Sequence, residues 1–152
     1  MRTIKFRGKC VADSKYAGQW VYGGYSEPQE DCKQNEGLIT VYLGGSSTCK
    51  YHVIPNTVGQ FTGLHDKNGK EIYEGDIVYS EFEDGSNGSS LVGWNKKQSC
   101  FGVMDEYAYR SKLEGFEYPE FQNHVMLAFM RDAKLFEVIG NIHDNPELLK
   151  GK

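Results

Sequence analysis

Residues 57–83 read TVGQFTGLHDKNGKEIYEGDIVYSEFE, and this stretch decides the fold. Its Asn68-Gly69 pair favours a hairpin turn, because both residues tolerate positive φ angles. A second tight turn is predicted at residues 74–76. Strands are predicted beside these turns, at residues 60–64, 71–73 and 77–79. The stretch therefore predicts short strands joined by tight turns.

The N-terminal sequence also alternates with the period of a strand. Along residues 3–11, apolar side chains lie on one side and the cations Lys5, Arg7 and Lys9 lie on the other. This pattern predicts a strand with one buried face. Together with the apolar run at residues 20–22 it predicts an N-terminal β-hairpin.

The rest of the chain predicts further strands and two helices. The strands are expected at residues 38–43, 48–54, 91–94, 101–104 and 135–142. Residues 84–90 (DGSNGSS) are expected to form a loop. Pro119 and the four-residue spacing of the apolar residues after it predict a helix over 119–131. Asn145 followed by Pro146 predicts a short helix near the C-terminus.

Many short strands separated by turn signals predict a mainly β fold with a minor α component. We favour a small, partly open SH3-like β barrel with an N-terminal β-hairpin extension and one or two short helices. A length of 152 residues fits a single domain over 1–152. Within it we expect an N-terminal β region at 1–55 and a barrel-like region at 56–152 that ends in a short helix.

Charge is unevenly distributed, although the formal net charge is only −4. We take the cations of the first strand and the aromatic residues of the next as a candidate interaction surface: Lys5, Arg7, Lys9, Trp20 and Tyr22. Two interpretations of the cations stay open, namely contact with phosphates or an acidic partner and protection of an exposed sheet edge. The acidic stretch at 71–84 is suited to pair with this surface within one chain or between subunits.

Cysteine usage and hydropathy indicate the compartment. The four cysteines, Cys10, Cys32, Cys49 and Cys100, include no C-x-x-C pair of the kind that indicates zinc or redox chemistry. The first residues lack the apolar segment of an export signal, so we expect a cytoplasmic protein with free thiols. No apolar run approaches the roughly 18 residues of a membrane span.

No catalytic, cofactor or metal motif is complete. Residues 66–69 resemble the start of a calcium loop, but Lys70 stands where a third oxygen ligand is needed, so a hairpin tip is favoured. The S-x-x-K spacing of Ser47 and Lys50 lacks its partner motifs. A Cys–His pair assembled from distant positions stays open. The carboxylates of the acidic stretch favour a solvated face over a metal site. We therefore predict that the protein is not an enzyme and that it binds no cofactor and no metal.

Three pieces of the chain carry a resemblance to a known family. They are residues 4–9 with 20–23, residues 53–64 with 66–78, and residues 137–142 with 145–149. In this order they resemble the YopX family of small proteins encoded by phages and prophages, whereas region 79–135 is poorly matched. The resemblance implies a phage-derived, cytoplasmic, β-rich protein. It implies no established activity and no catalytic residue.

Two functions of different classes are consistent with these features. The first is a non-enzymatic protein–protein interaction or self-assembling accessory module, which forms a homo-oligomer and binds a host or phage protein. The aromatic content of 13% favours it, because tyrosine and tryptophan are enriched at interfaces. The alternative is a nucleic-acid-binding accessory protein that uses the basic N-terminal strand, although the net acidity disfavours it.

Overall fold

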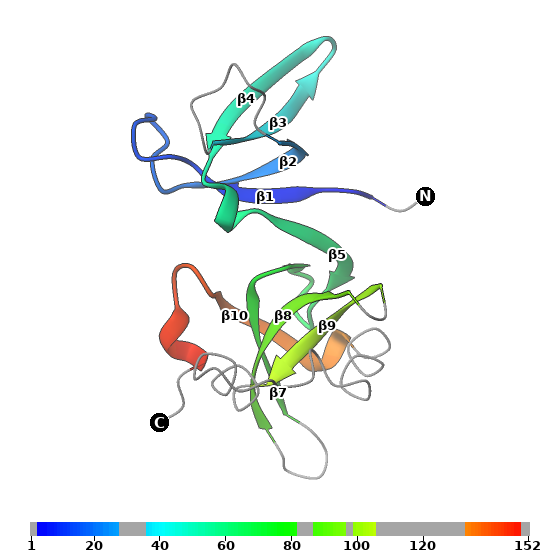
Figure 1. The fold of residues 1–152 in the computed structure, drawn as a ribbon. Coiled ribbons are helices and arrows are strands. Elements are labelled where there is room, and N and C mark those ends of the chain that lie inside the picture. The colour runs from blue at the N-terminus through cyan, green and yellow to red at the C-terminus, as the bar shows by residue number, and fades with distance from the viewer. Residues whose placement is uncertain (1–2, 28–35, 82–86, 97–98, 106–132, 150–152) are drawn as a thin grey trace. The chain divides into compact units, whose positions relative to one another are not determined.

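The structure is a computed structural model that describes residues 3–27, 36–81, 87–96, 99–105 and 133–149 (Figure 1). These residues form ten β-strands and three short 3₁₀ helices, so the prediction of a mainly β protein is confirmed. The chain divides into two compact units, Met1–Phe61 and Thr62–Lys152. Strand β5 (Gly59–His65) begins in the first unit and ends in the second.

The first unit is an antiparallel sheet with the strand order β4-β3-β2-β1-β5. Before β5 come β1 (Phe6–Lys9), β2 (Trp20–Ser26), β3 (Gly37–Gly44), β4 (Ser47–Val53) and the 3₁₀ helix η1 (Pro55–Thr57). A bridge between Cys10 and Val53, and a 2.9 Å hydrogen bond from the Ile54 N–H to the Lys9 carbonyl, join the end of β4 to the end of β1. Strand β1 therefore has hydrogen-bonded neighbours on both sides.

The alternation predicted for residues 3–11 determines which side of β1 faces the core of the first unit. Phe6 packs against Tyr25 with ring centroids 5.8 Å apart, and Cys10 is buried with Ile39 and Val53. These side chains share one face, since residues two apart on a strand point the same way. The intervening cations lie on the opposite face.

The second unit is built on an antiparallel sheet with the order β10-β7-β8-β9 and on the hairpin between β5 and β6. Its elements are β6 (Glu71–Tyr73), β7 (Asp76–Glu81), β8 (Asn87–Asn95), β9 (Cys100–Asp105), η2 (Ala133–Leu135), β10 (Phe136–Asn141) and η3 (Pro146–Leu149). Its core collects buried side chains from these elements: Ile72, Val78, Val92, Phe101, Val103, Ala133, Phe136 and Val138.

Several predictions can be compared with these elements. The strands predicted at 60–64, 71–73 and 77–79 correspond to β5, β6 and β7, and the short C-terminal helix is present as η3. The loop predicted over 84–90 is wrong for residues 87–90, which begin β8 and pair with β7. Pairing with β7 overrides the low strand propensity of their glycine and serine residues. The helix predicted over 119–131 lies outside the described residues.

An SH3-like barrel is not shown, because in the described part of each sheet the strands follow an open, linear order. The number and length of strands in the sequence favoured a small barrel, but closure depends on long-range pairing of the outer strands. The prediction of one domain with regions at 1–55 and 56–152 stays a prediction.

Candidate interaction surface

The hairpin of β1 and β2 places the five predicted surface residues on one face of the sheet. Arg7 lies opposite Tyr22 and Lys9 lies opposite Trp20 in the antiparallel register. Directly opposite residues share a face, and so do residues two apart on one strand. Lys5, Arg7, Lys9, Trp20 and Tyr22 therefore form one surface, which we call the cation–aromatic face.

Cations and rings alternate across the cation–aromatic face. The Lys5 ammonium lies 5.6 Å from the centre of the Tyr22 ring, and the Arg7 guanidinium lies 4.8 Å from the centre of the Trp20 ring. Both contacts are diagonal across the paired segments, with Lys5 immediately before β1 and Arg7 within it. Such cation–π contacts stabilise by about 0.5–1 kcal/mol at exposed sites and by about 2 kcal/mol where the cation is desolvated, so they orient the side chains on this face.

The centre and the ends of the cation–aromatic face differ in exposure. The Tyr22 ring is 44% exposed, whereas Arg7 is only 7% exposed. Lys5, Lys9 and Trp20 are half-buried. The reachable surface therefore consists of an ammonium group at each end and an aromatic ring between them.

Edge protection does not explain these cations. Protective lysines act on a strand whose hydrogen-bonding groups face solvent. Strand β1 is an interior strand, since Phe6 and Arg7 pair with both β2 and β5. The interior position of β1 therefore disfavours edge protection, and contact with an anionic partner stays a prediction.

The acidic stretch is not the continuous acidic surface that its sequence suggests. Asp76 is 1% exposed, and its carboxylate accepts a 2.7 Å hydrogen bond from the Tyr73 N–H. Glu71 accepts a 2.6 Å hydrogen bond from the Tyr73 hydroxyl. Only Glu81, at the end of β7, is exposed among the described carboxylates of this stretch, and Glu74 is half-buried. Glu83 and Asp84 lie outside the described residues.

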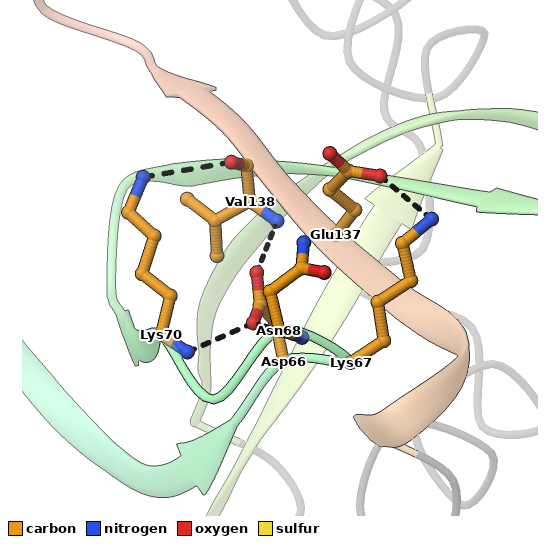
Figure 2. Close-up of polar contacts among 6 residues, drawn as sticks. All are labelled: Asp66, Lys67, Asn68, Lys70, Glu137 and Val138. Carbon is orange, nitrogen blue, oxygen red and sulfur yellow. Dashed lines mark hydrogen bonds and ion pairs between the residues drawn. The ribbon is translucent and has the colours of Figure 1, made fainter.

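Asp66 is a buried carboxylate that accepts hydrogen bonds from its own hairpin turn and from β10 (Figure 2). It is 4% exposed, and one carboxylate oxygen accepts hydrogen bonds from the N–H groups of Asn68 at 2.8 Å and Lys70 at 2.9 Å. The other oxygen accepts a 3.0 Å hydrogen bond from the Val138 N–H on β10. Gly69 completes the turn with a φ of 82°, a value that glycine adopts without strain.

These contacts settle the two interpretations of residues 66–69. Both carboxylate oxygens of Asp66 are used by backbone N–H groups, so the interpretation as a hairpin tip rather than a calcium loop is confirmed. Burial raises the pKa of Asp66, but the hydrogen bonds from Val138, Lys70 and Asn68 outweigh it, and the pKa lies below its ordinary value.

Two lysines strengthen the connection between this turn and β10. Lys67 forms a 2.6 Å ion pair with Glu137, and its own N–H donates to the Phe136 carbonyl. The hydrogen bond to Glu137 raises the pKa of Lys67. The Lys70 ammonium lies 3.5 Å from the Val138 carbonyl oxygen (Figure 2). The hairpin tip is thus fixed to the final strand by main-chain and side-chain contacts.

The structure brings together one cluster that sequence reasoning missed. Tyr16 and Tyr51 meet edge to face with centroids 5.3 Å apart, and the Lys15 ammonium lies 4.8 Å from the centre of the Tyr16 ring. Burial raises the pKa of Tyr51, and Cys49 raises it further. The residues come from β4 and from the loop after β1, and no local pattern links these two segments.

The described nucleophile candidates are three cysteines and the Ser47–Lys50 pair. Cys10, Cys49 and Cys100 are free thiols as predicted, and Cys32 lies outside the described residues. Burial raises the pKa of Cys10, which disfavours its thiolate. Ser47 and Lys50 are three apart on β4 and therefore point to opposite faces. His52 pairs with Glu36 at 2.9 Å.

The described residues show neither a metal-binding cluster nor a membrane-spanning helix. No group of three or more His, Cys, Asp or Glu side chains within them is arranged to hold a metal ion. No helix within them has the length and apolar character needed to cross a membrane.

Comparison with known proteins gives a family and a fold. A family model described as YopX protein matches residues 5–150. The crystal structure of protein EF1440 from Enterococcus faecalis is similar, with a TM-score of 0.50 and 19% identity over 98% of this chain and 99% of that chain. At this identity the likeness concerns the fold alone. No curated protein matches the chain.

Proposed function

Because this chain belongs to the YopX protein family, which supplies no activity to transfer, we propose from its own surface that it is a phage-derived, non-enzymatic protein-interaction module. It binds an acidic protein surface through the cation–aromatic face. The observation that carries the proposal is the alternation of three cations and two rings on an interior part of the sheet, which needs no edge protection.

The chemistry of this face suits carboxylates. Aromatic residues and arginine are enriched at protein interfaces, and complementary charges steer partners together. Two acidic groups of the second unit also support the proposal, because Asp66 and Asp76 accept hydrogen bonds from backbone N–H groups. A structural use of these groups fits a binding module better than an enzyme.

Nucleic-acid binding is the second candidate, and the same face is the reason to consider it. Single strands bind to basic grooves by stacking bases on aromatic rings. Here, however, the ring of Trp20 is already stacked with Arg7, and the ring of Tyr22 lies beside Lys5. With the Trp20 ring covered, Tyr22 is the one exposed ring on the cation–aromatic face. A single ring offers few stacking positions, so an acidic protein is favoured over an oligonucleotide.

The proposal is tested by capture from phage-induced host lysate with the tagged full-length protein, with and without nuclease. We expect a stoichiometric protein partner that survives nuclease and is depleted about tenfold or more when the bait carries Lys5→Glu and Lys9→Glu. The matched control, Lys96→Glu with Lys134→Glu, changes net charge equally at exposed sites of the second unit and should capture normally. Recovery of nucleic acid, with partners lost after nuclease, would instead favour the second candidate.

We also propose that the protein self-associates through opposite charges. The two units carry net charges of opposite sign, as this requires. Met1–Phe61 holds seven Lys and Arg against five Asp and Glu, a net of +2. Thr62–Lys152 holds ten against sixteen, a net of −6. We expect sedimentation equilibrium at low salt to give a mass above the 17.2 kDa of one chain, decreasing as salt screens the charges. A mass of one chain at every protein and salt concentration would contradict self-association.

A further inference from the structure

The cation–aromatic face has a charge–apolar–charge order that specifies more than an acidic partner. Lys5, the residue before β1, and Lys9, the last residue of β1, are four residues apart and share one face of the extended chain. At a rise of about 3.3 Å per residue their Cα atoms are about 13 Å apart. The Tyr22 ring is 44% exposed and lies opposite Arg7, midway between the two lysines. Arg7 is too buried to be the main contact of a ligand.

An extended chain matches this order better than a helix. Side chains on one face of an extended segment repeat every two residues, so positions i and i+4 are also about 13 Å apart. On a helix the same positions are only about 6 Å apart. A segment with carboxylates at i and i+4 and an apolar side chain at i+2 therefore meets Lys5, Tyr22 and Lys9 together.

We propose, on the basis of the proposed function, that the cation–aromatic face recognises an extended acidic segment with the pattern acidic–x–apolar–x–acidic. Both neighbours of β1 are strands of the same sheet, so the segment lies across the face and binds through side chains rather than by adding a strand. The pattern reads the same in both directions, and hence either polarity of the bound segment satisfies the two lysines. The recognised chemistry is two carboxylates held about 13 Å apart around an apolar group.

The experiment measures peptide affinity for the full-length protein by fluorescence anisotropy at low salt. The matched peptide carries Glu-Ser-Phe-Ser-Glu, and a second peptide of the same composition carries its two glutamates side by side. A third peptide replaces the phenylalanine with serine, and a single-stranded oligonucleotide is the fourth probe. We expect the matched peptide to bind about tenfold or more tightly than each of the others. Equal affinity for the first two peptides, or preference for the oligonucleotide, overturns the proposal.

Protein variants assign the contacts. Lys5→Glu with Lys9→Glu should lose the matched peptide and gain a swapped peptide, Lys-Ser-Phe-Ser-Lys, which also shows that this variant is folded. Tyr22→Ser should bind the phenylalanine and serine peptides equally while still preferring separated glutamates. Failure of the swapped peptide to bind a variant with native circular dichroism counts against the inference.

The outcomes separate this inference from the proposed function. If Lys5→Glu with Lys9→Glu abolishes capture of a lysate protein but the peptides are not distinguished, only the segment pattern is wrong. If the peptides are not distinguished and the variant captures that partner normally, the cation–aromatic face itself is excluded as the binding surface.

Discussion

Replacing Asp66 with alanine is expected to lower the free energy of unfolding of the second unit by about 3 kcal/mol, because each hydrogen bond to a charged group contributes about 1.5–3 kcal/mol. The carboxylate accepts hydrogen bonds from Asn68, Lys70 and Val138 inside the protein. Alanine leaves these N–H groups without their acceptor. Urea unfolding in a Trp20→Phe background, where Trp94 is the remaining tryptophan, measures the effect on this unit.

Two further variants control for this effect. Asp66→Asn keeps one acceptor oxygen and should cost less than Asp66→Ala. Glu81→Gln removes an exposed carboxylate from the same unit and should change stability by no more than about 0.5 kcal/mol. An Asp66→Ala protein as stable as Glu81→Gln would show that the turn does not depend on the carboxylate.

The pH dependence of the stability of the Asp66→Ala protein independently tests the direction of the Asp66 pKa shift. The pKa of Asp66 is lower in the folded protein than in the unfolded chain. Its ionised form therefore stabilises the fold above the ordinary carboxyl pKa of about 4, and this contribution is lost as the pH falls through the folded value. The stability difference between wild type and Asp66→Ala should be constant near neutral pH and shrink below about pH 4.

Residues 66–70 show which part of the structure can be predicted from the local sequence. Asn68 and Gly69 predict the turn, because their conformational preferences are local. The bond from Val138 to Asp66 joins residues 72 apart in the chain, and no local pattern contains it. The sequence therefore predicts the hairpin and places Asp66 in its tip, but it does not predict the attachment of the hairpin to β10.

The local sequence likewise predicts only some features of the cation–aromatic face. Alternation along residues 3–11 correctly places Lys5, Arg7 and Lys9 on one face, and the hairpin correctly brings Trp20 and Tyr22 beside them. The burial of Arg7 and the interior position of β1 arise from packing and from pairing with β5, a strand more than 50 residues away. These two facts disfavour edge protection, one of the two interpretations that the sequence left open, whereas the binding surface stays a prediction.

Replacing Gly23 with alanine is expected to destabilise the first unit by about 3 kcal/mol, at the upper end of the usual cost of overpacking. A Cβ atom at Gly23 would lie 2.1 Å from the Thr40 carbonyl oxygen, which belongs to the backbone of β3 and has no rotamer to change. The adjacent Gly24 is the matched control, because a Cβ atom there meets nothing within 4 Å. Gly24→Ala should be neutral or stabilise by up to about 1 kcal/mol, by restricting the unfolded chain.

Trp20 fluorescence in a Trp94→Phe background measures the stability of the first unit in both alanine variants. The effect should extend to function, since Gly23 lies next to Tyr22 and opposite Phe6, so that separating β2 from β3 also displaces the cation–aromatic face. Gly23→Ala should therefore lose the matched peptide, whereas Gly24→Ala binds it as wild type does. Equal stability of the two variants would mean that β2 and β3 do not approach as closely as the structure has them. Normal peptide binding by a destabilised Gly23→Ala protein would show that the binding surface does not depend on the packing of β2 against β3.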